Sequence, residues 1–349
     1  MSSHRSKKRK VDRDGEAGLV DTSKPSAIFE PTKGRQHTLS IALPGSIIAN
    51  AATHDQKSAL AGHIARACAV FCVDEVVVFD DGQAEIWPPE PNGYTAYTDP
   101  NFFLHHVLSY LETPPHLRRA LFPMHPDLKT AGALPSLDMP HHLRSDEWCP
   151  YREGVAVRQS KGGDGSSRTL LDCGLQQNVY LAASLEEKTR VTVKLPNERP
   201  SSSYDLECEA VSPDAPREEA GYYWGYSVRQ ASSLSAIFTD CPYDGGYDIS
   251  IGTSERGVPA QTVLDAKDDA YVEPTWGHLL LVLGGVAGLE AALAADGDLK
   301  EAGVTDPKEV FDRWVNLVPG QGSRTIRTEE AIWVGLTATR PLVEARNAA

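Results

Sequence analysis

The sequence predicts an α/β protein with a parallel sheet, into which a small β-barrel is inserted. Strand-like and helix-like runs alternate in two separate parts of the chain, at 38–81 and at 247–332. Several of the strand-like runs are apolar throughout, which is typical of parallel strands covered on both faces. Between 148 and 221 the sequence pattern changes to short β-rich runs separated by glycine and serine, which is typical of a small barrel.

The first strand–helix–strand unit lies at 38–81. The run "TLSIALPG" (38–45) alternates apolar and polar residues and ends at a Pro-Gly pair. Thr53 and Gln56 have the spacing of a capping box and predict the start of a helix. The run "DEVVVFDD" (74–81) is a short apolar strand bounded by acids. The predicted helix between the strands places four apolar residues on one face: Leu60, Ile64, Cys68 and Phe71.

The middle of the chain predicts one helix and the inserted barrel. The apolar spacing from Phe102 to Leu111 indicates a helix that packs on the sheet. The barrel strands are expected at "GVAVRQ" (154–159), "RVTVKL" (190–195) and "DLECEAV" (205–211), with "SKGGDGSS" (160–167) as a break.

Three predicted strands of the C-terminal half run into glycine-rich corners: "IGTSERG" (251–257), "VLGGVAGLE" (282–290) and "VPGQGSR" (318–324). The last corner follows a strand-like run, Val315 to Val318. Before it, Asp306-Pro307 predicts the start of a helix that carries Val310, Phe311 and Trp314. Parallel sheets bind ligands beyond the carboxyl ends of their strands, where glycines let the backbone come close, so we expect a ligand site here.

Composition excludes several classes of protein. The 349 residues carry 34 basic and 48 acidic side chains, a net charge of −14, which argues against unspecific coating of nucleic acid. No apolar run is long enough for a membrane span, and no secretory signal is expected. The basic run "HRSKKRK" (4–10) lies in a tail, 1–33, that we expect to be disordered. It is a nuclear-import address, a nucleic-acid tether or a merely solvated terminus.

Metal, phosphate and hydrolase motifs are not found. The pairs His105-His106 and His141-His142 lack ligand partners at metal spacing, so no metal is expected, and the six cysteines are spread as reduced thiols. The corner "PGQGSRT" has neither the lysine nor the spacing of a phosphate loop, and no G-x-S-x-G elbow is present. With these motifs excluded, the remaining candidate is a ligand held by main-chain groups, such as an adenosyl group.

Six segments, taken in order, resemble the SPOUT superfamily of S-adenosylmethionine-dependent RNA methyltransferases. Within it they are similar to the branch with an OB-like insertion, the SPOUT-domain-containing, centromere-protein-32-like proteins. The segments cover roughly 35–340: "GRQHTLSIALPGSIIANA", "HIARACAVFCVDEVVVFDD", "GYYWGYSVR", "YDISIGTSERG", "HLLLVLGGVAGLE" and "VPGQGSRTIRTEEAI". The resemblance implies a SPOUT domain at 34–147 and 222–340, an OB-like insertion at 148–221 and a C-terminal tail at 341–349.

The resemblance also implies a C-terminal trefoil knot that grips the cofactor S-adenosylmethionine. Glycines suit such a site because chain crossings leave no room for a Cβ. Glu255, Glu329 and Glu330 would offset the sulfonium charge, although Glu329 and Glu330 equally suit the first turn of a helix. The cofactor-binding residues that it implies are Gly252, Thr253, Ser254, Glu255, Leu283, Gly284, Gly285, Val318, Pro319, Gly320, Gln321, Gly322, Ser323, Thr325 and Ile326.

Catalytic and RNA-binding residues are expected among polar side chains near the three corners. The resemblance implies catalytic roles for Arg35, Asn50, Arg324 and Glu330. A guanidinium binds phosphate in a bidentate manner, and Arg256 and Arg327 are the expected RNA contacts. The aromatic run Tyr222, Tyr223, Trp224 and Tyr226 either stacks on RNA bases or belongs to the core; the core is favoured because the run lies where the chain returns to the sheet.

The expected function is S-adenosylmethionine-dependent methylation of a base in structured RNA such as rRNA, by a homodimer in the nucleus or nucleolus. The barrel would serve as an RNA platform. The alternative is a catalytically inactive RNA-binding or scaffolding protein that keeps the knot. The three intact glycine corners favour the enzyme, since a scaffold has no need of them.

Overall fold

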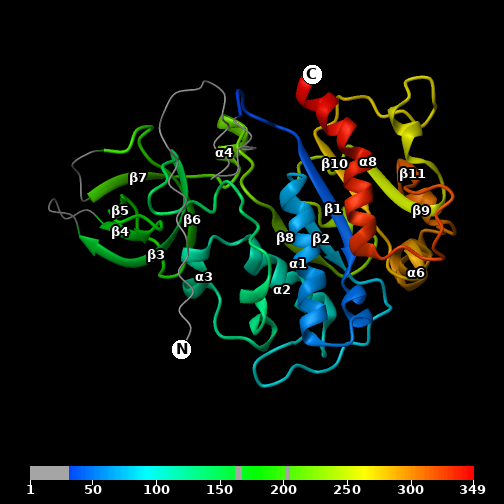
Figure 1. Ribbon diagram of the computed structural model, residues 1–349, viewed down its shortest axis with the longest axis horizontal. Coiled ribbons are helices and arrows are strands. Elements are labelled where there is room, and N and C mark those ends of the chain that lie inside the picture. Colours follow the sequence, from blue (N-terminus) through cyan, green and yellow to red (C-terminus); the bar gives the residue numbers. More distant parts are fainter. Residues whose placement is uncertain (1–30, 162–166, 201–204) are drawn as a thin grey trace, which may run out of the picture.

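The computed structural model describes residues 31–161, 167–200 and 205–349, and places a closed barrel beside a domain built on a parallel sheet (Figure 1). The sheet order is β11-β9-β10-β1-β2-β8, and every neighbouring pair is parallel. The predicted parallel sheet is therefore confirmed. Its strands are β1 (Thr38–Pro44), β2 (Glu75–Phe79), β8 (Ser227–Ala231), β9 (Ile249–Pro259), β10 (His278–Val282) and β11 (Arg313–Asn316).

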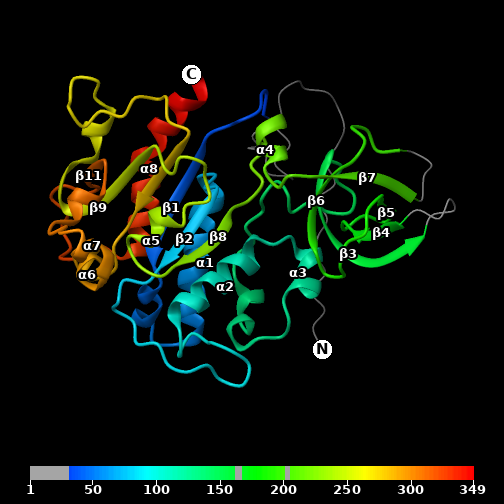
Figure 2. The ribbon, with the colours of Figure 1, turned by 180° about the vertical axis from the view of Figure 1, so that it is seen from behind.

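Helices cover both faces of the sheet, which explains its continuous apolar strands. Ile41 and Val76 belong to the core under one face, whereas Ala42 and Val77 belong to the core under the other. The first face carries α1 (His54–Val70), α2 (Pro100–Glu112) and α8 (Thr328–Ala348). The second carries α5 (Ala236–Thr239), α6 (Gly288–Ala295) and α7 (Gly297–Glu301), which are seen in Figure 2.

The start of α1 has the predicted capping box. The Thr53 hydroxyl accepts a hydrogen bond from the Gln56 amide at 3.3 Å, and the Gln56 side chain accepts from the Thr53 amide at 3.2 Å. Two backbone donors of the first turn are thereby satisfied. The short helix α3 (Pro115–Leu121) touches the barrel, where His116 Nε2 lies 3.1 Å from the Glu153 carbonyl, and α4 (Ala215–Ala220) lies where the chain leaves the barrel.

The insertion folds into a closed barrel with its own core. The strand order is β3-β4-β5-β7-β6, with β6 pairing back to β3, and only β5 and β7 are parallel among the described pairs. A separate barrel within the insertion is confirmed; residues 162–166 of the predicted break lie outside the described residues. The strands are β3 (Tyr151–Lys161), β4 (Ser167–Asp172), β5 (Asn178–Leu181), β6 (Arg190–Lys194) and β7 (Asp205–Val211).

A buried ionic cluster joins the barrel to the sheet domain. Arg190 on β6 binds both carboxylate oxygens of Glu112 at the end of α2, at 2.7 and 3.1 Å, and also Glu153 on β3 at 2.7 Å. Burial alone would raise the pKa of Glu112, but Arg190 and His141 outweigh it and hold this pKa at about 2. Trp224 donates to Glu153 and is buried with Tyr223 and Tyr226, as the core interpretation of this run expects.

Two elements near the C-terminus differ from the sequence-based expectation. The helix expected after Asp306-Pro307 is a single turn of 3₁₀ helix, Pro307–Val310, and Trp314 lies on β11. Residues 341–349, expected as a tail, continue α8 to Ala348. Leu342 and Val343 are buried in the core there, and this burial favours continuing the helix beyond Pro341.

The basic run at 4–10 lies outside the described residues, so its expected disorder stays a prediction. None of the helices in the described part of the chain is long and apolar enough to cross a membrane.

Candidate functional site

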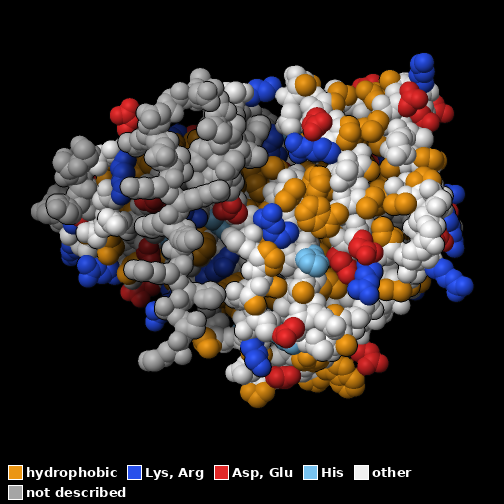
Figure 3. Space-filling model, viewed as in Figure 1, with side chains coloured by type: hydrophobic (Ala, Val, Ile, Leu, Met, Phe, Trp, Pro, Cys, Tyr) orange, Lys and Arg blue, Asp and Glu red, His pale blue; other side chains and the backbone are white. Residues whose placement is uncertain are grey.

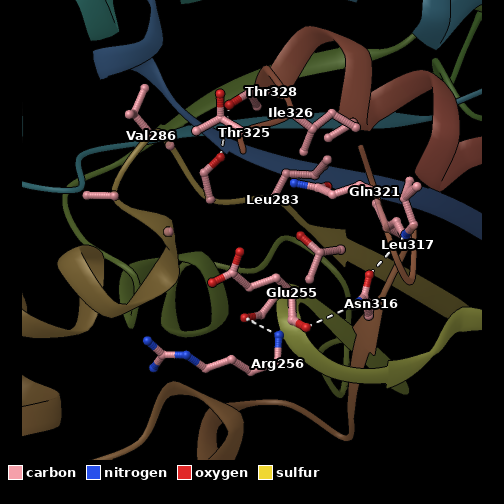
Figure 4. A pocket seen from close by; sticks show the side chains of 18 of the residues that line it. Glu255, Arg256, Leu283, Val286, Asn316, Leu317, Gln321, Thr325, Ile326 and Thr328 are labelled. Carbon is pink, nitrogen blue, oxygen red and sulfur yellow. Dashed lines mark hydrogen bonds between the residues drawn. The ribbon is translucent and has the colours of Figure 1, made fainter. Parts of the chain in front are cut away.

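A pocket of about 340 Å³ opens beyond the carboxyl ends of β10 and β11, bounded by the start of α8 and by residues 253–256 of β9. The corner predicted at 251–257 is not a turn after the strand: β9 continues to Pro259, and residues 253–257 bulge out where its pairing with β11 shifts register. In Figure 4, Leu283 and Gln321 lie near its centre, Thr325 on one side, and Glu255 and Arg256 on the opposite side. The three glycine-rich corners of the sequence therefore meet at one place, as the parallel topology requires.

The β10 corner contributes main chain to this pocket. Gly284, Gly285 and Gly288 all line it, and a glycine can offer only backbone atoms. A Cβ on Gly284 would lie 2.8 Å from the backbone of Gly288, so the corner folds back on itself too tightly for a side chain. Gly288 has φ +71°, in the left-handed region that glycine tolerates. The sequence Gly-Gly-Val-Ala-Gly thus builds a wall of peptide groups.

The β9 corner is tied to both neighbouring strands by side-chain hydrogen bonds. Thr253 donates its hydroxyl hydrogen to the carbonyl of Val282 on β10, at 3.0 Å. From the other side, the side-chain amide of Asn316 on β11 donates to the backbone carbonyl of Glu255 at 2.8 Å, as Figure 4 shows. These bonds fix the edges of the pocket, because β9 cannot shift along either neighbour without losing one of them.

The β11 corner is a tight turn over Val318–Gln321. The backbone N–H of Gln321 donates to the Val318 carbonyl at 3.1 Å. Pro319 is the second residue of the turn, and Gly320, the third, has φ +74°. Proline and glycine are the preferred residues at these two positions of a type II turn. The turn directs Gln321 into the pocket, whereas Pro319 and Gly320 are outside its lining.

The start of α8 closes the fourth side. Thr328 donates its hydroxyl hydrogen to the carbonyl of Gly284 at 2.9 Å, which joins the helix to the β10 corner. The Arg327 amide donates to the Glu330 side chain at 3.0 Å. Glu330 therefore caps the helix and is exposed, while its neighbour Glu329 turns inward with a side chain only 14% exposed.

A second pocket, of about 580 Å³, adjoins the first. The two share four lining residues: Val286, Thr325, Ile326 and Thr328. The second pocket adds Asn50 from the end of the 3₁₀ turn Gly45–Asn50, His63 from α1, and Arg327 with Glu329 from the start of α8. Two ligands bound side by side would meet at the shared wall.

Charged groups of both signs surround the first pocket. Glu255 and Glu290 supply carboxylates, whereas Arg256 and Arg324 supply guanidinium groups. Arg256 is 74% exposed and approaches Glu290 only to 3.5 Å, so it is free to meet another anion. Behind the β10 corner, Asp81 is buried at the end of β2 and accepts a hydrogen bond from Ser46 at 2.8 Å. Burial raises the pKa of this carboxyl group.

Most of the residues expected to bind the cofactor come together in the first pocket. Arg324 and Arg256 also line it, and Asn50 and Arg327 line the second pocket. The expected residues outside both linings are Arg35, Gly252, Pro319, Gly320, Gly322, Ser323 and Glu330. The residues brought together are Thr253, Ser254, Glu255, Leu283, Gly284, Gly285, Val318, Gln321, Thr325 and Ile326.

Arg35 lines neither of these two pockets. It precedes β1, at the amino end of the sheet, whereas the pockets lie at the carboxyl ends of the strands. Its guanidinium binds both oxygens of Asp74, at 2.7 and 2.8 Å. Within one chain, Arg35 therefore acts as a structural ion pair at the start of β1.

Several lining residues were not expected from the sequence. Asn316 and Thr328 flank the β11 corner and were not expected, because they lie outside the predicted corner at 318–324. Glu329, which was expected only to offset the sulfonium charge, lines the second pocket, whereas Glu330, which was expected to be catalytic, does not. The capping-box spacing from Arg327 to Glu330 was the available signal, because a glutamate at the third helical position bonds back to the chain.

The structure also brings His106 near His125 and Asp127, a grouping that the sequence spacing did not suggest. Both histidine Nδ1 atoms lie 3.4–3.5 Å from one Asp127 oxygen. The other Asp127 oxygen accepts from the Ala96 amide, and His125 Nδ1 accepts from the Asp127 amide. These bonds occupy the side chains as a loop anchor. His141 and His142, the adjacent pair for which no metal was expected, both contact the backbone carbonyl of Glu112 through Nε2.

The first pocket fits S-adenosylmethionine in size and chemistry. Its volume is in the range of small-molecule sites, roughly 300–1,000 Å³. Backbone groups at 284–288 can bind the polar edge of an adenosyl group, Leu283 and Ile326 offer apolar contact, and Glu255 offers a negative charge for a sulfonium.

The class of the protein is given by its family, an RNA methyltransferase family. A family described as "Putative RNA methyltransferase" matches residues 38–339, which is most of the chain, and the protein belongs to that family.

Named relatives agree with this class. The chain is 46% identical over 320 residues to the human "28S rRNA (uridine-N(3))-methyltransferase", covering 90% of this chain and 81% of that protein. It is 43% identical over 315 residues to the Drosophila melanogaster protein of the same name, covering 88% and 62%. An uncharacterised protein of Haloarcula marismortui is 28% identical over 322 residues, covering 86% and 98%.

Proposed function

We propose that this protein transfers a methyl group from S-adenosylmethionine to N3 of a uridine in the rRNA of the large ribosomal subunit. The observation that carries the proposal is the pair of adjoining pockets, one suited to the cofactor and one to a nucleotide. The reaction named for the human and Drosophila relatives supports the choice of uridine N3 and of 28S rRNA.

In this proposal the three corners hold the cofactor, which supplies the electrophilic methyl group. The peptide groups of Gly284 and Gly285 bind it from β10, and the turn at 318–321 covers it from β11. The bond between Thr328 and Gly284 keeps the two walls together. Holding two reactants in line can supply on the order of 7–11 kcal/mol of the barrier, so a rigid pocket is the main contribution of the chain.

The second pocket would receive the uracil ring. The Watson–Crick edge of uracil has two carbonyl oxygens beside the N3 proton, and the Asn50 amide can donate to a carbonyl. Methylation of N3 also requires that its proton leave. Glu329 is the largely buried carboxylate in this lining and would accept the proton, while Arg327 would bind a flanking phosphate.

We also infer that the sheet domain is a SPOUT domain and that the segment 317–327 forms the trefoil knot. The pairing of β11 with β9 and the return of Thr328 to Gly284 support this, because both bring the C-terminal segment against the β10 corner. The strand order of the barrel, with its third and fifth strands parallel, supports an OB-fold.

A symmetric homodimer is part of the proposal. Hydrophobic side chains gather over α1 and α8 on the face shown in Figure 3. Val70 is 48% exposed and Trp333 36%, and Trp333 packs edge-on against Phe71 with ring centroids 5.8 Å apart. An exposed apolar patch of this kind is typical of an interface, and two-fold dimers are the commonest oligomers. We place the protein in the nucleus or nucleolus because of the basic run at 4–10.

The function is tested by incubating the purified protein with S-adenosylmethionine and large-subunit rRNA that lacks the modification. We expect 3-methyluridine in the digested RNA. Glu329→Gln should lower the rate by roughly 10²–10⁴-fold with cofactor binding unchanged. Glu330→Gln is the matched control, because glutamine still accepts the Arg327 amide. Methylation at another atom, or equal loss in the two variants, would refute the assigned chemistry.

A further inference from the structure

One outer strip of the barrel combines an aromatic ring with cations that have no carboxylate partner among the described residues. The strip consists of Arg158 on β3, Arg168 and Leu170 on β4, and Tyr180 on β5. The register pairs Arg158 with Leu170 and Leu170 with Tyr180, and side chains of directly paired residues point to the same face. The neighbours Leu171, Val179 and Leu181 fill the barrel core, so the strip faces outward.

The ring and the cation in this strip are already organised for stacking. The Arg168 guanidinium lies over the Tyr180 ring, 4.1 Å from its centroid. Among the described residues, no carboxylate pairs with Arg168 or Arg158, although 14 other ion pairs are present. Arg158 is fully on the surface. A half-buried guanidinium–ring stack presents a flat face without charge compensation, and such a face suits both a base and a phosphate.

Charge is distributed unevenly on the two sides of Tyr180. On the far side of Tyr180, β7 carries three exposed acids, Asp205, Glu207 and Glu209, and Glu207 is the register partner of Tyr180. A phosphate backbone would be repelled there. It would be attracted over β3 and β4, where Arg158, Lys161 and Arg168 lie.

We propose that this strip binds unpaired nucleotides of the RNA substrate, with a base stacked at Tyr180 and its flanking phosphates at Arg168 and Arg158. This inference rests on the proposed function for the identity of the ligand, and it assigns the barrel a site separate from both pockets. In five-stranded barrels of this order, the face of the second and third strands binds oligonucleotides. Here those strands are β4 and β5, which carry Arg168 and Tyr180.

The test measures binding of the full-length protein to a short unstructured RNA, and to the same strand annealed to its complement. Tyr180→Ala should weaken binding of the single strand by about 5- to 150-fold, the usual effect of removing one stacked base. Tyr180→Phe should retain binding, because the ring remains. Arg158→Ala and Arg168→Ala should each lower the slope of log affinity against log salt by about 1, whereas Tyr180→Ala should leave this slope unchanged.

Matched controls lie outside the strip. Tyr97→Ala removes an exposed ring from the sheet domain, and Lys300→Ala removes an exposed cation from α7; both should bind RNA normally. The affinity for S-adenosylmethionine should be unchanged in every variant. A wrong assignment of the RNA-binding strip can therefore be distinguished from a wrong assignment of the methyltransferase activity. Normal single-strand affinity in Tyr180→Ala, or equal weakening with duplex RNA, would overturn the proposal while leaving the enzyme activity in place.

Discussion

The hydroxyl of Thr328 donates to the carbonyl of Gly284 at 2.9 Å, and this bond joins the first turn of α8 to the glycine corner of β10. The two residues are 44 positions apart in the sequence, and both line the first pocket. The bond therefore holds the last helix against the wall that is proposed to bind the cofactor.

Thr328→Val tests this closure, because valine keeps the shape of threonine and removes the donor. We expect an affinity for S-adenosylmethionine that is lower by about 5- to 10-fold, equivalent to the ~1 kcal/mol of a typical hydrogen bond. Titration calorimetry measures it. Thr337→Val on the same helix is the control, since the Thr337 hydroxyl bonds only within α8, to the Trp333 carbonyl. Equal affinities in the two variants would show that the bond does not support the site.

A comparison of Gly284→Ala with Gly322→Ala tests which glycine, that of the β10 corner or that of the β11 corner, is needed for cofactor binding. From the sequence, both glycines were expected to bind the cofactor. In the structure no described atom lies within 4 Å of the position that a Gly322 Cβ would take, whereas a Gly284 Cβ would meet backbone at 2.8 Å. We now expect Gly284→Ala to abolish cofactor binding and Gly322→Ala to preserve it.

Thermal unfolding separates loss of the site from loss of the fold in this comparison. Loss of binding in Gly322→Ala, with normal binding in Gly284→Ala, would place the cofactor on the turn at 318–321 and not on the β10 corner.

Glu112→Gln tests the cluster that joins the barrel to the sheet domain. The folded state lowers the pKa of Glu112 from 4.5 to about 2, so its contribution to stability is present above about pH 4.5 and lost as the pH falls towards 2. The variant should be destabilised near pH 7, because Arg190 keeps only Glu153 as a partner. Urea unfolding from pH 7 to 3 should show the difference shrinking with acid, and a constant difference would contradict this account.

Trp333→Glu tests the proposed dimer. A carboxylate in the apolar patch over α1 and α8 would be buried without a partner at the interface, so we expect the mass in solution to fall from that of a dimer to 37.9 kDa. Trp87→Glu changes a tryptophan that is 56% exposed and lies outside the patch, and it should leave the mass unchanged. Light scattering measures both. A wild-type protein that is monomeric at working concentration would remove the dimer from the proposal.

The sequence predicted the parts of the fold that depend on local pattern. Apolar runs located β1, β2 and β10, the capping box placed the start of α1, and the glycine corners located the first pocket. Each of these signals lies within about ten residues of chain.

What sequence reasoning missed depends on contacts between distant residues or on the geometry of a single turn. The junction of Glu112 with Arg190 spans 78 residues, and no local pattern indicates it. At the start of α8, a rotation of one residue decides that Glu329 faces the second pocket and Glu330 the solvent. Arg35 is adjacent to a strand in the sequence but belongs to its amino end, which is far from where parallel strands bind ligands.

The most direct test of the central claim is nucleoside mass spectrometry of large-subunit rRNA from cells that lack the gene. The account predicts that 3-methyluridine disappears from one position, that the wild-type protein restores it, and that the Gly284→Ala protein does not. If 3-methyluridine persists at full level without the gene, the protein is not the methyltransferase proposed here, and the scaffolding alternative takes its place.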